Sequence, residues 1–111
     1  MNESRTKHHW FAALLCCASL VAHGQAPVLP VVKEGKTQKI SPHVYLIPDE
    51  KVGMVPNVGI IVGSRATLVV DPGMGLKSGE AVLREVEKIS KNKDLYIINT
   101  HFHPEHTTGD L

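Results

Sequence analysis

Three histidines and one glutamate lie within six residues of the sequence, as His101, His103, Glu105 and His106. Imidazole and carboxylate are ordinary zinc ligands, and three protein ligands leave one position open for water. Bound zinc lowers the pKa of that water to about 7 and polarises carbonyl or phosphoryl oxygens, so hydrolysis becomes possible at neutral pH. The cluster therefore predicts a metal site, and the alternative is a loose surface cluster that picks up metal adventitiously.

The local pattern also predicts how these side chains point. Along an extended chain His101 and His103 lie on the same side, because side chains alternate with a period of two residues. Pro104 favours extended geometry at His103, and the chain must then turn for His106 to reach the same point. Gly109 could allow a close backbone approach where the next element begins. We expect the three imidazoles to converge at the end of a strand.

Other signatures of metal and nucleotide chemistry are absent from the sequence. There is no His-Glu-x-x-His helix of the zincin proteases and no glycine-rich phosphate loop. The segment His103-Pro-Glu105 matches the start of the zinc deaminase pattern, but the Pro-Cys-x-x-Cys that must follow is missing. His43 stands alone, and we expect it to be an ordinary surface or core residue.

The first 24 residues have the layout of a secretory signal peptide. Arg5 and Lys7 precede an apolar run over residues 10–22, which is too short to span a membrane. Small residues suit cleavage after Gly24, and the alternative is an amphipathic helix of the folded domain. We expect an exported protein, periplasmic or secreted, with no stable membrane anchor after cleavage.

The remaining residues, 25–111, contain no cysteine, because Cys16 and Cys17 lie inside the apolar run. A metal in this segment must therefore be held by nitrogen and oxygen ligands. The segment has ten Lys and Arg residues against ten Asp and Glu residues, so its formal net charge is zero. This balance indicates neither a nucleic acid nor an anionic membrane as partner, and we expect a small-molecule substrate.

Hydrophobic periodicity predicts an α/β domain over residues 40–111, after a flexible lead-in over residues 25–39. The predicted elements, in order, are a strand at 43–47, a loop at 49–56, a hairpin of strands at 58–62 and 66–70, a sharp break at 71–75, an amphipathic helix at 78–91 and a strand at 95–98. Ser78 is a plausible N-cap for the helix. The last strand is apolar without interruption, which predicts burial on both faces.

The segment Thr100-His-Phe-His-Pro-Glu-His-Thr-Thr-Gly109 resembles the His-x-His-x-Asp-His signature of the metallo-β-lactamase superfamily. Upstream, Val58-Gly-Ile-Ile-Val62 and Ala66-Thr-Leu-Val-Val-Asp71-Pro-Gly73 resemble the N-terminal hairpin of that family, which ends in Asp-x-Gly. The resemblance covers residues 40–111. It implies the N-terminal half of an αββα sandwich, in which a mixed sheet is covered by helix.

The resemblance also implies roles for individual residues. In that family the first two histidines of the signature help bind a first metal, which implies His101 and His103. The Asp and the final histidine help bind a second metal, which implies Glu105 and His106. Glu105 is one methylene longer than the expected Asp, so it could ligate the metal or act as the base that orients water. Asp71 would support the catalytic loop from behind, or would simply form the turn before Pro-Gly.

Three functions are compatible with these residues. The first is a hydrolase that uses hydroxide on one or two zinc ions to attack an ester, amide, thioester or phosphoester. The second is an iron-binding oxidoreductase of the same fold, and the third is an inactive metal-binding fragment. Family members extend well beyond 111 residues and supply further ligands from their second half, so we expect this chain to be the incomplete N-terminal part of a longer enzyme. The fold does not select the substrate.

Overall fold

The computed structural model describes residues 26–110 of the chain. The predicted signal peptide lies outside the described residues. The elements follow in the order β1 (Gln38–Lys39), β2 (Val44–Ile47), β3 (Val58–Val62), β4 (Ala66–Val70), α1 (Gly75–Ile89), β5 (Asp94–Ile98) and α2 (Pro104–Thr107). Among these residues, none of the helices has the length and apolar character that crossing a membrane requires. The order of the elements confirms the predicted succession of strand, hairpin, helix, strand and histidine loop.

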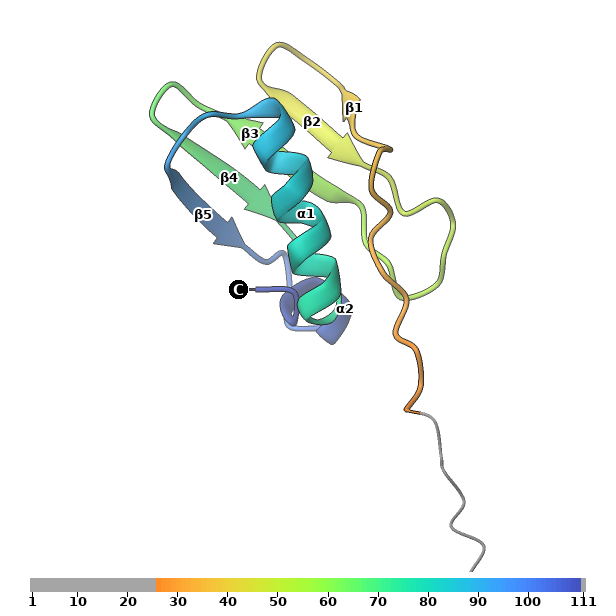
Figure 1. Ribbon diagram of the computed structural model, residues 1–111. Coiled ribbons are helices and arrows are strands. Elements are labelled where there is room, and N and C mark those ends of the chain that lie inside the picture. The colour runs from red at the N-terminus through yellow and green to blue at the C-terminus, as the bar shows by residue number, and fades with distance from the viewer. Residues whose placement is uncertain (1–25, 111) are drawn as a thin grey trace, which may run out of the picture.

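The five strands form one mixed sheet in the order β1-β2-β3-β4-β5 (Figure 1). Strands β1 to β4 pair antiparallel. The predicted hairpin is β3 and β4, in which Gly59 lies opposite Val70 and Val62 lies opposite Thr67. Strand β5 then pairs parallel with β4, with Val70 opposite Ile98. Because this pair is parallel, the carboxyl ends of β4 and β5 lie side by side at the same end of the sheet, so the loops that follow them are neighbours.

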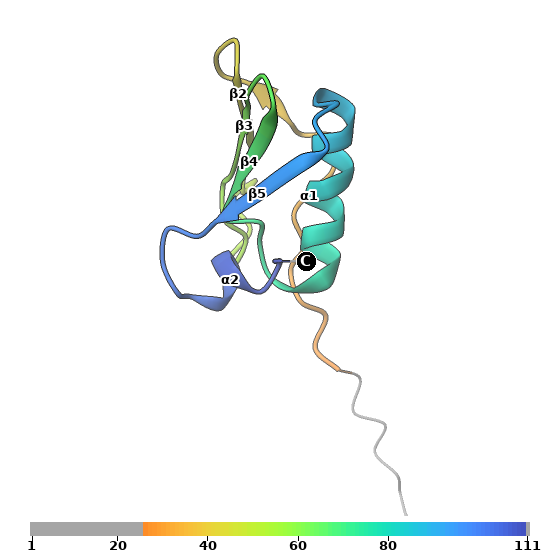
Figure 2. The same cartoon turned by 90° about the vertical axis from the view of Figure 1, so that its left-hand side faces the viewer.

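Helix α1 covers one face of the sheet (Figure 2). Its buried side chains meet the residues of β2, β3 and β4 that alternate onto this face. The buried hydrophobic core consists of Val32, Ile47, Val58, Ile60, Val69, Val82 and Val86. This arrangement confirms the predicted α/β class, with a mixed sheet covered by helix.

Helix α1 begins three residues earlier than the sequence predicted. Its N-cap is Met74, which makes no side-chain capping hydrogen bond, and Ser78 is instead a fully buried residue inside the helix. The helix starts as soon as the chain leaves the turn, where Gly73 and Gly75 have φ angles of 97° and 70°. The N-cap prediction for Ser78 was therefore wrong, because these glycines end the turn before Ser78.

Strand β5 is not buried on both faces, as its apolar sequence predicted. Tyr96 is 61% exposed and Ile98 is 50% exposed. The strand lies at the edge of the sheet, and among residues 26–110 only the face toward α1 is covered by a helix (Figure 2). Composition indicates that a strand tolerates burial, but burial itself needs a covering element on each face.

The described part of the predicted lead-in, residues 26–39, contains a short strand and a buried valine. Strand β1 lies within it and pairs Gln38 with Leu46 of β2, and Val32 is only 3% exposed. A two-residue strand is too short to leave a periodic pattern in the sequence. The burial of Val32 depends on a helix more than forty residues away in the sequence, so no local signal reveals it.

Glu85 of α1 is a buried carboxylate, only 3% exposed. It accepts hydrogen bonds from the ammonium of Lys88, the hydroxyl of Thr37 and the backbone N–H of Gly35, the last at 2.9 Å. Burial raises the pKa of Glu85, but these three hydrogen bonds together lower it below its ordinary value. The carboxylate therefore stabilises the folded chain in its ionised form.

Replacing Glu85 by glutamine is expected to lower the free energy of unfolding at pH 7 by about 1–3 kcal/mol, because charge-assisted hydrogen bonds are lost from a buried site. A lowered folded-state pKa stabilises the protein above the unfolded pKa, and the stabilisation is lost as pH falls through the folded value. The difference between wild type and Glu85→Gln should therefore shrink on acidification. Urea melts at pH 7 and pH 3 measure it, with the exposed Glu87→Gln as control. An equal difference at both pH values contradicts this assignment.

Candidate metal centre

The candidate site is built from two loops that leave the sheet side by side. One is the turn of residues 71–75 after β4, and the other is the histidine loop of residues 99–110 after β5. The backbone N–H of Asp71 donates to the carbonyl of Ile98 at 3.0 Å, which extends the β4–β5 ladder by one bond. Helix α2 then lies below the ends of both strands (Figure 1). The parallel register thus places the turn next to the histidines.

Asp71 connects the two loops through its side chain. Its Oδ1 accepts a hydrogen bond from the backbone N–H of Thr100 at 2.8 Å, and its Oδ2 accepts one from the hydroxyl of Thr100 at 2.7 Å. The same Oδ2 lies 3.0 Å from Nδ1 of His106. Asp71 is 5% exposed and has a φ of 55°, which aspartate tolerates better than most residues. It both forms the turn and faces the histidine loop.

These contacts also keep Asp71 ionised. Burial raises the pKa of Asp71, but the hydrogen bonds from Thr100 and the contact with His106 together lower it below its ordinary value. An ionised carboxylate in this position accepts hydrogen bonds only. The neighbouring groups must therefore turn their protons toward it.

This orientation favours the tautomer of His101 and His106 that carries its proton on Nδ1. The hydroxyl of Thr100 gives its hydrogen to Asp71, so it accepts from Nδ1–H of His101, 3.0 Å away. His106 Nδ1 is buried near Asp71 Oδ2, off the ideal hydrogen-bond direction, and has no other partner among residues 26–110. With Nδ1 protonated in both rings, each Nε2 retains its lone pair for a ligand. A histidine that binds a metal through one ring nitrogen commonly donates the N–H of the other to a carboxylate, which orients the ring.

The first two histidines of the cluster face each other, although residues 100–102 form a bend rather than the extended stretch that the sequence predicted. His101 Nε2 lies 3.1 Å from His103 Nδ1. Two nitrogens bound to one tetrahedral zinc ion at 2.0–2.1 Å are separated by about 3.4 Å, so this pair fits a shared metal with little movement. Pro104 is the first residue of α2, whose single turn brings the third histidine back. The ring centroids of His101 and His106 are 4.0 Å apart.

The full ligand set is less complete than the sequence predicted. Among residues 26–110 no three His, Cys, Asp or Glu side chains are arranged to hold a metal ion together. Glu105 Oε1 lies 3.8 Å from His103 Nδ1, and its side chain is 22% exposed. Its carboxylate therefore lies beside the pair. The structure thus provides a nitrogen pair, with His106 and Glu105 adjacent.

Gly109 makes the close backbone approach that the sequence predicted. Its N–H donates to the carbonyl of Gly73 at 2.8 Å. A Cβ atom at this position would lie 2.7 Å from the carbonyl oxygen of Pro72 and 2.8 Å from that of Gly73. A second bond joins the same loops, from the N–H of Gly75 to the hydroxyl of Thr108 at 3.0 Å. The site therefore depends on two loops held in direct backbone contact.

Sequence reasoning did not assign a role to Thr100, which connects Asp71 to His101. Its position directly before the first histidine was visible, but its role depends on the parallel pairing that places Asp71 opposite it. The side chain of His43, by contrast, is exposed, and its backbone carbonyl accepts a hydrogen bond from the N–H of Val62, at the end of β3 away from the cluster. It lies away from the cluster, as the sequence indicated for a lone histidine.

Comparison with known families agrees with this geometry. The family model described as "Metallo-beta-lactamase superfamily" matches residues 52–110, which is more than half of the chain. The match includes the β3–β4 hairpin, helix α1, strand β5 and both loops of the candidate site. No curated protein matches the chain.

Proposed function

Because this chain belongs to the metallo-β-lactamase superfamily, we propose that it contributes the first ligand cluster of a zinc-dependent hydrolase. The superfamily is largely hydrolytic, and its members commonly bind metals. The observation that supports the proposal best is the nitrogen pair of His101 and His103, 3.1 Å apart. His106 and Glu105 complete the proposed ligand set from the adjacent turn.

A bound zinc ion would supply a Lewis acid and an activated water at neutral pH. The chain's own residues have two tasks around it. Asp71 and Thr100 hold His101 and His106 with their Nε2 lone pairs available, so the ligands need little reorganisation. Glu105 is the partly exposed carboxylate nearest the pair, and it either ligates the metal or takes a proton from the attacking water. The proposed substrate is an ester, amide, thioester or phosphoester.

Removal of the metal tests this proposal directly. We expect the complete enzyme that contains this chain, once exchanged into zinc, to hydrolyse at least one substrate from a panel of p-nitrophenyl acetate, p-nitrophenyl phosphate, a thioester and a β-lactam. Chelation followed by gel filtration should abolish the activity, and added zinc should restore it. Restoration by iron alone would instead favour an oxidoreductase centre, since imidazole and carboxylate also suit iron. An unchanged rate in chelated, metal-free protein contradicts the proposal.

A further inference from the structure

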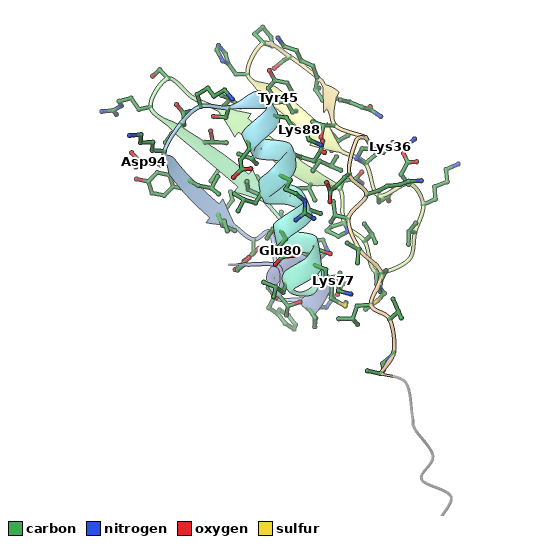
Figure 3. All side chains as sticks on the ribbon, viewed as in Figure 1. Lys36, Tyr45, Lys77, Glu80, Lys88 and Asp94 are labelled. Carbon is green, nitrogen blue, oxygen red and sulfur yellow. The ribbon has the colours of Figure 1, made fainter. Side chains whose placement is uncertain are left out.

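Residues 31–37, here called the strap, run beside helix α1 before the sheet begins (Figure 1). Figure 3 shows Lys36 on this segment and Lys88 on α1. At one end of the strap, the backbone N–H of Val32 donates to the hydroxyl of Ser78 at 3.3 Å. Both residues are buried, Val32 at 3% exposure and Ser78 at 0%. The strap is therefore fixed to the first turns of the helix.

The other end of the strap is fixed two helical turns further along. The backbone N–H of Gly35 and the hydroxyl of Thr37 both donate to the buried carboxylate of Glu85. Next to them, Nη2 of Arg84 lies 2.6 Å from Oε1 of Glu34 in an exposed ion pair. An exposed pair adds little stability by itself, so Glu85 is the main attachment at this end.

The strap and the helix both contact the turn that holds Asp71. Gly73 has a φ of 97°, and a Cβ atom there would lie 2.7 Å from Cγ2 of Val32 and 2.8 Å from Cβ of Ser78. Val32 of the strap and Ser78 of the helix therefore both pack against the same side of Gly73. Protein interiors are close-packed and transmit small displacements, so a displacement of Val32 is expected to move this turn.

The same turn also contacts the histidine loop. The carbonyl of Gly73 accepts the hydrogen bond from Gly109 at 2.8 Å, and Asp71 lies two residues upstream, in contact with Thr100 and His106. A continuous set of contacts therefore runs from the strap through the turn to the histidines. Sequence patterns did not reveal it, since the strap lies within the predicted flexible lead-in.

We propose that the strap is a positioning element of the metal site. Val32 and Ser78 hold the turn at Gly73, and Glu85 keeps the strap attached to the helix. The turn then positions the histidine loop. Detachment of the strap would let the turn and the histidine loop separate, which lowers metal affinity. The statement about metal affinity rests on the proposed function, whereas the statement about positioning does not.

The test compares two valine-to-alanine substitutions. One lies next to the first turns of α1, and the other lies near the end of that helix. Val32→Ala opens the strap next to the turn, whereas Val86→Ala removes the same atoms from an equally buried core position toward the far end of the helix. In the metal-free chain, we expect Val32→Ala to speed hydrogen exchange at the amides of Gly109 and Thr100 about tenfold relative to Val86→Ala. Zinc affinity, measured by competition with a chromophoric chelator, should fall about tenfold in Val32→Ala alone.

Two further variants keep the test decisive. Val32→Ile preserves the contact and should restore both readouts. If Val32→Ala does not fold, Thr37→Val removes one strap hydrogen bond without a loss of volume and should shift both readouts in the same direction. Faster exchange in a chain that binds no zinc would support the positioning role and refute the proposed function. Equal exchange rates and equal zinc affinities in Val32→Ala and Val86→Ala would overturn the inference.

Discussion

Replacing His103 by alanine is expected to weaken zinc binding by roughly a hundredfold or more. Protein zinc sites with four ligands are stabilised by about 10–16 kcal/mol, so one ligand contributes roughly 3 kcal/mol when that energy is shared evenly. His103 Nδ1 is one of the two nitrogens already placed 3.1 Å apart, so its loss removes half of the formed pair. Competition titration of the purified protein against a chromophoric chelator measures the change.

Two comparison variants give this result its meaning. His43→Ala removes an exposed imidazole at the other end of the sheet and should leave the affinity unchanged. Asp71→Asn keeps every imidazole but replaces the carboxylate that contacts His106 directly and His101 through Thr100. It should weaken zinc binding by about tenfold. If His103→Ala binds zinc as tightly as the wild type, the cluster is not the site.

The second large effect is expected from Gly109→Ala. The added Cβ would lie within 3 Å of the carbonyl oxygens of Pro72 and Gly73, and neither backbone group can rotate away as a side chain could. The two loops must separate, which breaks the hydrogen bond from Gly109 to Gly73. Overpacking of this kind costs about 1–3 kcal/mol of folding stability, and zinc affinity should fall with it by about tenfold or more.

A glycine in open space provides the control for this substitution. A Cβ atom at Gly53 would meet nothing within 4 Å, so Gly53→Ala changes the unfolded chain in the same way without a steric clash. Denaturant melts of the two variants separate these contributions. Equal stability and equal zinc affinity of Gly109→Ala and Gly53→Ala would show that the contact between the loops does not support the site.

Much of the fold could be predicted from the sequence because it depends on local patterns. The β3–β4 hairpin follows from two β-branched runs around a glycine, and most of helix α1 follows from its apolar spacing. The exposure of β5 and the burial of Glu85 could not be predicted in this way. Both depend on which element covers a given face, and periodicity does not contain that information.

In the candidate site, too, local features could be predicted from the sequence and long-range contacts could not. The sequence predicted that His101 and His103 would face each other, although the chain between them bends at residues 100–102. The role of Gly109 follows from its lack of a side chain. The contact between Asp71 and Thr100 requires the parallel register of β4 and β5, which joins residues 29 positions apart. Long-range pairing of this kind leaves no mark in a single sequence.

The central claim is that the histidine cluster binds zinc through imidazole nitrogens that Asp71 and Thr100 hold in place. X-ray absorption at the zinc edge, on protein exchanged into zinc and freed of excess metal, tests it most directly. We expect bound zinc with at least two imidazole ligands at about 2.0–2.1 Å, and fewer imidazoles in His103→Ala. Protein that retains no zinc, or zinc with only water and carboxylate oxygens around it, would contradict the account.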